Sequence, residues 1–254
     1  MPSIDYSPDK IIIEVEHLQK RFGDNVVLTD INMVLYEEEN LVVLGKSGTG
    51  KSVLIKCMVG LIKPDAGKLM VLNKDIMTAD NYEMDELRKQ IGFSFQMSAL
   101  YDSMTVRENL EFPLKRNEPN VGRGEMNDRV EEALHNVGLL YAIDMMPVEL
   151  SGGMQKRVGI ARTLILNPKI ILYDEPTAGL DPITAKEINE LILSVQETYK
   201  TSSIIITHDL TCARMTGNRI NLMAEGEFPI KGTYEDLQKI SDPRLAPFFE
   251  YSSS

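Results

Sequence analysis

Hydrophobic positions along this chain follow two periods, one typical of strands and one typical of helices. Strands are predicted where β-branched and other apolar residues run together or alternate, at 11–16, 26–35, 41–44, 91–95, 170–173 and 203–207. The run at 41–44 is apolar at every position, as expected of a parallel strand buried on both faces. Helices are predicted between the strands, at 51–61, 82–89 and 183–199, and a turn is predicted at 64–67. This alternation predicts an α/β protein with a mostly parallel sheet flanked by helices.

The pattern changes between 96 and 150, where helical periods replace the alternation. Thr105 and Glu108 have the spacing of a capping box and predict the start of a helix. A polar stretch at 116–124 is predicted to be a loop, and a further helix is predicted at 125–137. A mostly helical insertion is therefore expected to interrupt the strand–helix chain.

The hydrophobic content allows a packed core, and the net charge narrows the classes of molecule that the chain could bind. Of the 254 residues, 43% are hydrophobic, and the formal net charge is −11. A general nucleic-acid binder needs a basic face, so this charge argues against that class of protein. Cys57 and Cys212 belong to no C-x-x-C pair and are expected to be ordinary thiols in a reducing compartment. The first residues lack the pattern of a signal peptide, and no apolar run approaches the ~20 residues of a membrane helix, so we expect a soluble protein.

A glycine loop follows the apolar run at 41–44 and precedes a predicted helix. It matches the pattern G-x-x-x-x-G-K-[ST] at every fixed position, and its residues are Gly45, Lys46, Ser47, Gly48, Thr49, Gly50, Lys51 and Ser52. The backbone N–H groups of such a loop surround phosphate oxygens, and the glycines leave room for them. Lys51 would reach the β- and γ-phosphates of a nucleotide, and the Ser52 hydroxyl would bind Mg²⁺. Incidental glycines between a strand and a helix are the alternative, and the position of the loop favours phosphate binding.

Asp174 and Glu175 follow the predicted strand at 170–173. The carboxyl end of a strand is where an open parallel sheet binds its ligands. Because successive strand residues face opposite ways, we expect the two acids to have different tasks. Asp174 would hold the water shell of the metal, and Glu175 would polarise the attacking water. A solvated start of a loop is the alternative, and the glycine loop favours the catalytic interpretation.

A second candidate phosphate site lies at Ser151, Gly152 and Gly153, before a helix that carries Lys156 and Arg157. Two glycines in a first helical turn cost roughly 1 kcal/mol each relative to alanine. An N-cap serine alone does not require that cost, whereas close approach to a phosphate does.

The segment 150–157 resembles the signature motif of ATP-binding-cassette (ABC) ATPases, the glycine loop resembles their Walker A motif, and 170–175 resembles their Walker B motif. The likeness extends over about 11–230. The resemblance implies a P-loop NTPase fold of ABC type, with an N-terminal antiparallel β subdomain and an inserted α-helical subdomain. It implies one nucleotide-binding domain over 1–254, in which the helical subdomain covers about 97–165 and a short C-terminal helical tail covers about 233–254.

The same resemblance assigns further residues of the site. Phe22 is similar to the aromatic that stacks on adenine, although a core or turn phenylalanine is the simpler alternative. Gln96 is similar to the glutamine that touches metal and water and senses the membrane partner. Asp181 lies in a loop that is similar to the one crossing the dimer interface. His208 is similar to the switch histidine at the γ-phosphate, although a lone histidine after a strand is more often structural.

These matches imply a mechanism that needs two copies of the chain. Two copies would sandwich two molecules of ATP, and Ser151, Gly152 and Gly153 of each copy would contact the γ-phosphate that the other copy holds. The catalytic residues would be Lys51, Glu175 and His208, and the Mg²⁺ ligands would be Ser52, Gln96 and Asp174.

The segments 96–114, 147–154, 181–184 and 241–249 resemble the Mla-type lipid-transport ATPases. Those ATPases pair with a permease and an MCE-domain lipid-binding protein to move phospholipid between the membranes of diderm bacteria. We therefore expect an integral membrane permease to dock near Gln96–Tyr101, where small and apolar residues would line the groove. The chain would be a cytoplasmic protein on the cytoplasmic face of the inner membrane.

Several alternatives stay open. An amino-acid importer or a lipoprotein exporter would share all the core motifs. A P-loop kinase would explain the glycine loop but would leave 151–157 without a task. A soluble cassette protein acting on DNA or ribosomes usually carries two cassettes or a long coiled coil, and a scaffold without ATPase activity would not need Glu175 and His208.

Overall fold

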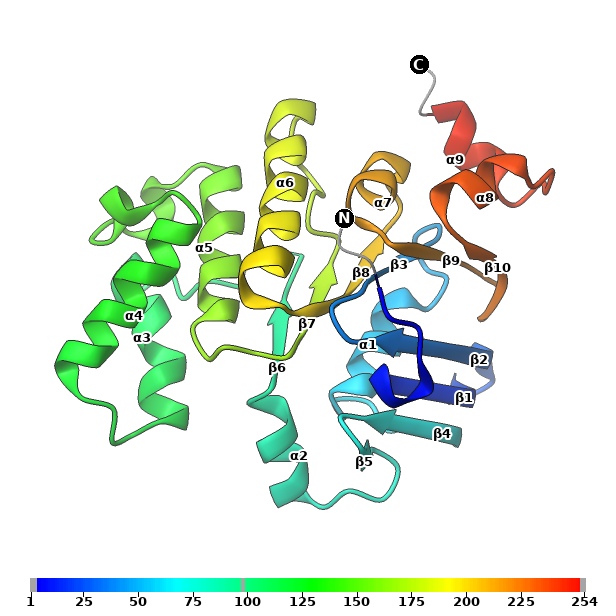
Figure 1. Ribbon diagram of the computed structural model, residues 1–254, viewed down its shortest axis with the longest axis horizontal. Coiled ribbons are helices and arrows are strands. Elements are labelled where there is room, and N and C mark those ends of the chain that lie inside the picture. Colours follow the sequence, from blue (N-terminus) through cyan, green and yellow to red (C-terminus); the bar gives the residue numbers. More distant parts are fainter. Residues whose placement is uncertain (1–3, 97–98, 252–254) are drawn as a thin grey trace.

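A computed structural model describes residues 4–96 and 99–251, which fold around one long mixed sheet (Figure 1). The strands of these residues lie in the order β5-β4-β1-β2-β10-β9-β3-β8-β7-β6. Their bounds are β1 (Ile11–Phe22), β2 (Asn25–Tyr36), β3 (Asn40–Leu44), β4 (Ala66–Val71), β5 (Lys74–Asp75), β6 (Ile91–Ser94), β7 (Ile170–Asp174), β8 (Ser202–Thr207), β9 (Arg219–Ala224) and β10 (Glu227–Gly232). The helices are α1 (Lys51–Met58), α2 (Asn81–Arg88), α3 (Val106–Asn117), α4 (Arg123–Asn136), α5 (Gly152–Leu164), α6 (Pro182–Tyr199), α7 (Leu210–Thr216), α8 (Tyr234–Lys239) and α9 (Ala246–Tyr251).

The parallel half of the sheet is built on β3, which lies between β8 and β9 and is buried at every residue. Alternate residues of β3 enter different cores, as expected when both faces of a parallel strand are covered. Val42 and Leu44 join a cluster with the helices α3 to α7, whereas Leu41 and Val43 join a second cluster with α1 and the strands β1 and β2. The predicted parallel sheet flanked by helices is therefore confirmed.

The antiparallel half consists of β1, β2, β4 and β5, and it lies below α1 in Figure 1. It joins the parallel half through a single parallel pairing of β10 with β2, between Glu227 and Asp30. The predicted antiparallel N-terminal region is confirmed. The strands β4, β5, β9 and β10 were not predicted from the sequence. The strand β5 has no apolar residue and β4 carries glycine and charge near its start, whereas the apolar residues of β9 and β10 are a signal that could have been recognised.

The turn predicted at 64–67 is shorter than expected, because β4 already begins at Ala66. Gly67 has a φ of +98°, and a Cβ there would lie 2.5 Å from the carbonyl oxygen of His17. Glycine therefore allows β4 to pack against the irregular stretch of β1 near His17. The sequence suggested a turn at Gly67, but the structure shows a close contact between two strands there.

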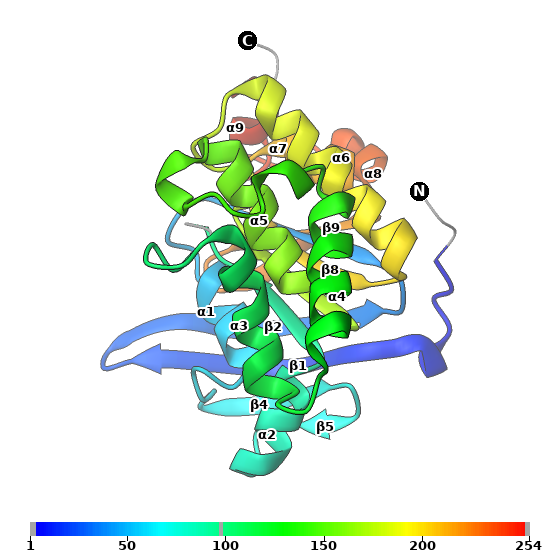
Figure 2. The same ribbon diagram turned by 90° about the vertical axis from the view of Figure 1, so that its left-hand side faces the viewer.

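The helices α3, α4 and α5 stand together at one end of the sheet, and Figure 2 shows this end facing the viewer. The capping box predicted at the start of α3 is present: the Glu108 N–H donates to Thr105 Oγ1 at 3.2 Å, and the Thr105 N–H donates to Glu108 Oε2 at 2.8 Å. The helices α8 and α9 lie in the predicted C-terminal tail, of which residues 252–254 fall outside the described residues. None of the described helices is long and apolar enough to cross a membrane.

A buried ion pair links the turn before β3 to the start of β9. Glu39 is fully buried, and Arg219 donates to both of its carboxylate oxygens and also to the Val34 carbonyl at 2.8 Å. The guanidinium also lies 5.3 Å from the ring centroid of Tyr36. This pair fixes β9 beside β3, which carries the glycine loop.

Replacing Arg219 by methionine is expected to lower the free energy of unfolding by about 3–5 kcal/mol, because the Glu39 carboxylate would stay buried without its cation. Chemical denaturation followed by circular dichroism measures this. The matched control is Lys68→Met, which removes an exposed cation that pairs with Glu14 and Glu16 and should cost at most about 1 kcal/mol. Equal losses in the two variants would contradict a structural role for the buried pair.

Candidate functional site

A cavity of about 450 Å³ opens where β3, β7 and β8 end. The carboxyl edge of a parallel sheet is the usual place for a ligand, and the volume is that of a small-molecule site. The lining residues are Phe22, Val27, Ser47, Gly48, Gly50, Lys51, Ser52, Val53, Gln96, Asp174, Glu175 and His208. Apart from the two valines, each of them was expected from the sequence to meet a nucleotide or its metal.

The glycine loop has the backbone that a phosphate cradle requires. Gly50 has a φ of +101°, and a Cβ there would lie 3.0 Å from Val27. Gly48 has a φ of +82°, and a Cβ added there would have no atom within 4 Å. Its backbone is therefore uncovered where it lines the cavity. The loop leads into α1, whose first N–H groups have no partner within the helix and attract anions. The loop therefore fits the phosphates of a nucleotide.

The other residues of the loop keep its shape. Gly45 donates its N–H to the Thr207 carbonyl at 3.2 Å, and a Cβ on Gly45 would lie 2.8 Å from the Met223 carbonyl. The Thr49 hydroxyl donates to the Lys46 carbonyl at 3.0 Å. Gly45, Lys46 and Thr49 are thus positioned to support the cradle rather than to line the cavity.

Lys51 is 5% exposed and lies at the centre of the cradle. Its Nζ donates to the carbonyl oxygens of Gly45 at 2.6 Å and Lys46 at 3.0 Å, and it lies 3.6 Å from Glu175 Oε1. Burial lowers the pKa of Lys51, and the nearby Glu175 carboxylate opposes this shift. A phosphate would add negative charge beside this ammonium and would favour its charged form.

Ser52 and Asp174 form the half of the site that fits a metal ion. The Ser52 hydroxyl donates to Asp174 Oδ1 at 3.2 Å, so two oxygen ligands from α1 and β7 already lie together. Gln96 adds an amide oxygen at the same cavity. Burial raises the pKa of Asp174, and a bound cation would lower it again. Oxygen ligands of this kind, with water and phosphate, are those that Mg²⁺ takes.

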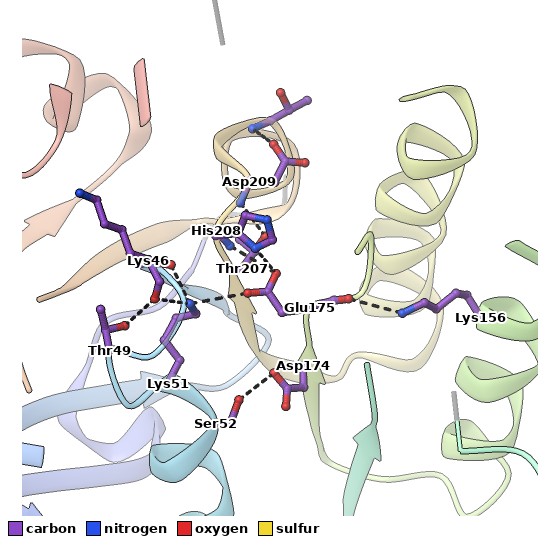
Figure 3. Close-up of polar contacts among 12 residues, drawn as sticks. Lys46, Thr49, Lys51, Ser52, Lys156, Asp174, Glu175, Thr207, His208 and Asp209 are labelled. Atoms are coloured by element: carbon purple, nitrogen blue, oxygen red, sulfur yellow. Dashed lines mark hydrogen bonds and ion pairs between the residues drawn. The ribbon is translucent and has the colours of Figure 1, made fainter. Parts of the chain in front are cut away.

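Glu175 points away from Asp174, toward Lys51 and His208 (Figure 3). Glu175 Oε2 lies 2.8 Å from His208 Nδ1 and also accepts the backbone N–H of His208 at 3.3 Å. The side chain of Glu175 is mostly buried, whereas about half of the His208 side chain is exposed. The structure thus gives the two acids different neighbours, the Ser52 hydroxyl for Asp174 and a polar cluster of Lys51 and His208 for Glu175.

The backbone of Glu175 is in the left-handed region, with a φ of +50°. Non-glycine residues pay roughly 1–3 kcal/mol for such a conformation, which persists only where the surroundings fix it. The Glu175 N–H donates to the Ile206 carbonyl at 2.9 Å, and its own carbonyl accepts the Ala178 N–H at 3.1 Å. The turn after β7 is therefore held so that the carboxylate points across to β8.

The loop after β8 adds residues that sequence reasoning missed. The Asp209 N–H donates to Thr207 Oγ1 at 3.0 Å, and Asp209 caps α7 by accepting the Thr211 N–H at 2.7 Å. These bonds set the path of the chain on both sides of His208. The aspartate two residues before Thr211 is an ordinary N-cap signal and could have been recognised.

Phe22 lies at the end of β1, where it lines the cavity and is 48% exposed. Lys20 places its Nζ 5.2 Å from the ring centroid. An exposed ring at the mouth of the cavity, rather than in the core, is available to stack on a base.

Ser151, Gly152, Gly153 and Asp181 lie outside this cavity, at the starts of α5 and α6. Ser151 caps α5 by accepting the Met154 N–H at 3.3 Å, and Asp181 caps α6 by accepting the Thr184 N–H at 3.1 Å and its hydroxyl at 2.6 Å. The hydrogen bonds from Thr184 lower the pKa of Asp181.

Gly153 has a packing reason that the sequence did not indicate. A Cβ at Gly153 would lie 2.5 Å from Thr184 Cγ2, whereas a Cβ at Gly152 would lie 3.7 Å from the nearest atom, on Leu180. Close contact between the starts of α5 and α6 therefore requires Gly153. Gly152 is exposed and is left available for a ligand.

Comparison with known proteins identifies the family. Residues 28–178 match the protein family described as ABC transporter. The probable ribonucleotide transport ATP-binding protein mkl of Mycobacterium leprae is 36% identical over 241 residues, which are 95% of this chain and 69% of that protein. The intermembrane phospholipid transport system ATP-binding protein MlaF of Haemophilus influenzae is 32% identical over 242 residues, covering 95% of this chain and 91% of that protein.

Among solved structures, a dimeric post-hydrolysis state of the ATP-binding cassette MJ0796 bound to ADP and Pi superposes with a TM-score of 0.78 at 33% identity. It covers 87% of this chain and 98% of that one. The fold, the glycine loop and the acidic pair thus occur together with ATP use, typically with Mg²⁺. This chain belongs to the ABC transporter family and is an ATPase subunit that hydrolyses ATP.

Proposed function

We propose that this chain powers the movement of phospholipid between the inner and outer membranes of a diderm bacterium and so maintains lipid asymmetry. The observation that carries the lipid assignment is the match to MlaF along nearly the whole length of both proteins. The likeness at 96–114 and 241–249, outside the motifs that all cassettes need, supports it. The chain would act from the cytoplasmic face of the inner membrane.

The partners in this proposal are a second copy of the chain, an integral membrane permease and an MCE-domain lipid-binding protein. The permease would dock near Gln96–Tyr101, within a helical subdomain at about 97–165. Met97 and Ser98 lie outside the described residues. At either end of this segment, Phe95 is 41% and Tyr101 is 45% exposed, and such apolar side chains suit a helix of a partner.

Within one copy, the chain's own groups would bind and orient ATP. Phe22 would stack on adenine, the N–H groups of the glycine loop would surround the phosphates, and Lys51 would turn from the loop carbonyls to the β- and γ-phosphates. Ser52, Gln96 and Asp174 would hold Mg²⁺, which neutralises phosphate charge when bound. Gly48 and Ser52 both line the cavity, which supports this assignment.

Hydrolysis would depend on Glu175 and His208. The Glu175 carboxylate would accept a hydrogen bond from the attacking water and align it with the γ-phosphorus. His208, which lies 2.8 Å from that carboxylate, would fix its orientation and reach toward the γ-phosphate. Electrostatic groups of this kind are each worth several kcal/mol of the barrier, so the loss of one should slow turnover strongly.

The second copy would complete the site. Ser151, Gly152 and Gly153 do not line the cavity of their own copy, which supports the proposal that they would meet the phosphate held by the other copy. Asp181 would cross the interface beside them. ATP would thus close two copies together, and hydrolysis would reopen them.

A second candidate cargo is a ribonucleotide. The mkl protein of M. leprae, whose name assigns it to ribonucleotide transport, has a higher identity to this chain than MlaF, although the match covers less of its length. Cargo contacts the permease rather than the ATPase, so the two candidates are separated only by experiment.

Replacing Glu175 by glutamine is expected to lower kcat for ATP hydrolysis by about 100- to 10,000-fold, because an amide cannot act as a base. ATP binding should persist, and size-exclusion chromatography should show a dimer that depends on ATP. Glu190→Gln, on the exposed side of α6, is the matched control and should keep normal turnover. Unchanged turnover in the Glu175 variant would remove that residue from catalysis.

The cargo is tested by purifying the membrane complex that contains this chain and identifying its bound small molecules by mass spectrometry. We expect phospholipids, together with a permease and an MCE-domain protein. A preparation made through an unrelated membrane protein in the same detergent controls for adventitious lipid. Recovery of a ribonucleotide other than ATP or ADP, or of an amino acid, in place of lipid would contradict the proposal.

A further inference from the structure

A buried lysine connects three parts of the site. Lys156 lies on α5, five residues after Ser151, and it is 9% exposed. Its Nζ donates to the main-chain carbonyl oxygen of Gln96. It also donates, at 3.4 Å, to the main-chain carbonyl oxygen of Glu175 (Figure 3). These acceptors lie 60 and 19 residues away along the chain. One ammonium group therefore joins the start of α5 to the glutamine after β6 and the glutamate after β7.

The choice of residue is informative, because a lysine is almost never this buried unless its ammonium group is paired. An ammonium group has three donors and no acceptor, so it can bridge two carbonyl groups that face each other. The ammonium group is charged, so both hydrogen bonds are charge-assisted, and the bond to the Glu175 carbonyl is the longer of the two. The bridge thus holds two loops at a fixed separation.

The two hydrogen bonds of Lys156 act on Gln96 and Glu175, whose positions decide catalysis in the proposed mechanism. Glu175 holds a left-handed backbone conformation, and Lys156 adds a third fixed bond to those made by Ile206 and Ala178. Gln96 is otherwise exposed at the cavity. A shift of either main chain would move the water-binding carboxylate or the amide oxygen at the metal, and small misplacements of such groups slow a reaction strongly.

Lys156 lies on α5, the helix that begins at the second candidate phosphate site formed by Ser151, Gly152 and Gly153. Lys156 follows Ser151 by five residues, or about 7.5 Å along a helix that rises 1.5 Å per residue. Because α5 is rigid over this length, a displacement at its first turn reaches Lys156 directly. Gly153 packs against Thr184 on the other side, so the first turn cannot move independently of α6.

We propose that Lys156 is a positioning residue that ties the first turn of α5 to Gln96 and Glu175, so that contact of Ser151 with the nucleotide of the second copy sets the hydrolytic residues of its own copy. The proposal rests on the function proposed above, in which Ser151 acts in the other copy. It adds a route by which the nucleotide bound in one ATP site affects the hydrolytic residues of the other site.

The test replaces Lys156 by methionine in the full chain. We expect kcat to fall about 10- to 100-fold while KM for ATP and the affinity for a fluorescent ATP analogue stay within about twofold, because Lys156 positions groups and binds no nucleotide. Lys156→Arg can still bridge both carbonyl groups and should restore most of the rate. Lys115→Met, which removes an exposed lysine of α3, is the matched control and should change neither value.

The methionine variant should fold, because the Glu175 carbonyl keeps its bond from Ala178 and the exposed Gln96 can meet water. Hydrogen exchange should show faster exchange in the turn after β7 for this variant and not for Lys115→Met. A normal kcat in the methionine variant, or an equal loss of ATP affinity, would overturn the proposal.

A double-mutant cycle with Ser151→Ala tests the link between the two ends of the tie. If Lys156 transmits the contact of Ser151, the double variant should be little slower than the slower single variant. Independent, multiplicative losses would overturn the link. If instead Glu175→Gln turned over normally, the proposed function itself would fail, so the two failures are distinguishable.

Discussion

The site depends on a partly buried polar cluster in which the Glu175 carboxylate meets the Lys51 ammonium at 3.6 Å and the His208 ring at 2.8 Å. These groups come from three loops, and the sheet brings them together. The strand β3 pairs with β8 through Leu44 and Thr207, and β7 pairs with β8 through Asp174 and Ile206, so the three strands end at one level. A slip of one residue in this register would turn each side chain to the other face. The same cluster explains why Glu175 tolerates a left-handed backbone, since its neighbours fix the turn from both sides.

Much of this arrangement could be predicted from the sequence, because it follows from local patterns. The apolar run before Gly45 predicted a buried strand, the glycine spacing predicted the cradle, and Asp174 and Glu175 were expected at a strand end with different tasks. The capping box at Thr105 was equally local. What the sequence did not indicate depends on contacts between distant segments. The Gly153–Thr184 contact joins two helix starts, and the Lys156 bridge joins α5 to two loops. Neither contact leaves a period or a spacing along the chain.

The geometry also separates two kinds of phosphate contact. Lys51, Ser52 and the glycine loop surround the cavity of one copy, whereas the turn at Ser151 stands apart from it and packs through Gly153 against Thr184 at the start of α6. A phosphate carries more negative charge than Lys51 alone can balance, and burying it requires further donors. In the proposed assembly a second copy supplies them, and the family's dimer with bound ADP and Pi is consistent with that use. The helices α3, α4 and α5 at one end of the sheet would then connect ATP hydrolysis to a membrane partner.

The central claim is that each ATP site is completed by two copies, and complementation between two inactive variants tests it most directly. Lys51→Ala disables the cradle and leaves the turn at Ser151 intact. Gly152→Asp leaves the cradle intact and brings a carboxylate to the turn, at an exposed position where a Cβ meets little. Each variant alone should be inactive, but a mixed dimer contains one site built from two intact halves. The account predicts that mixing restores ATP hydrolysis, up to about a quarter of the normal rate for random pairing of copies in a symmetric dimer. No recovery on mixing, together with full activity of the Gly152 variant as a monomer, would contradict it.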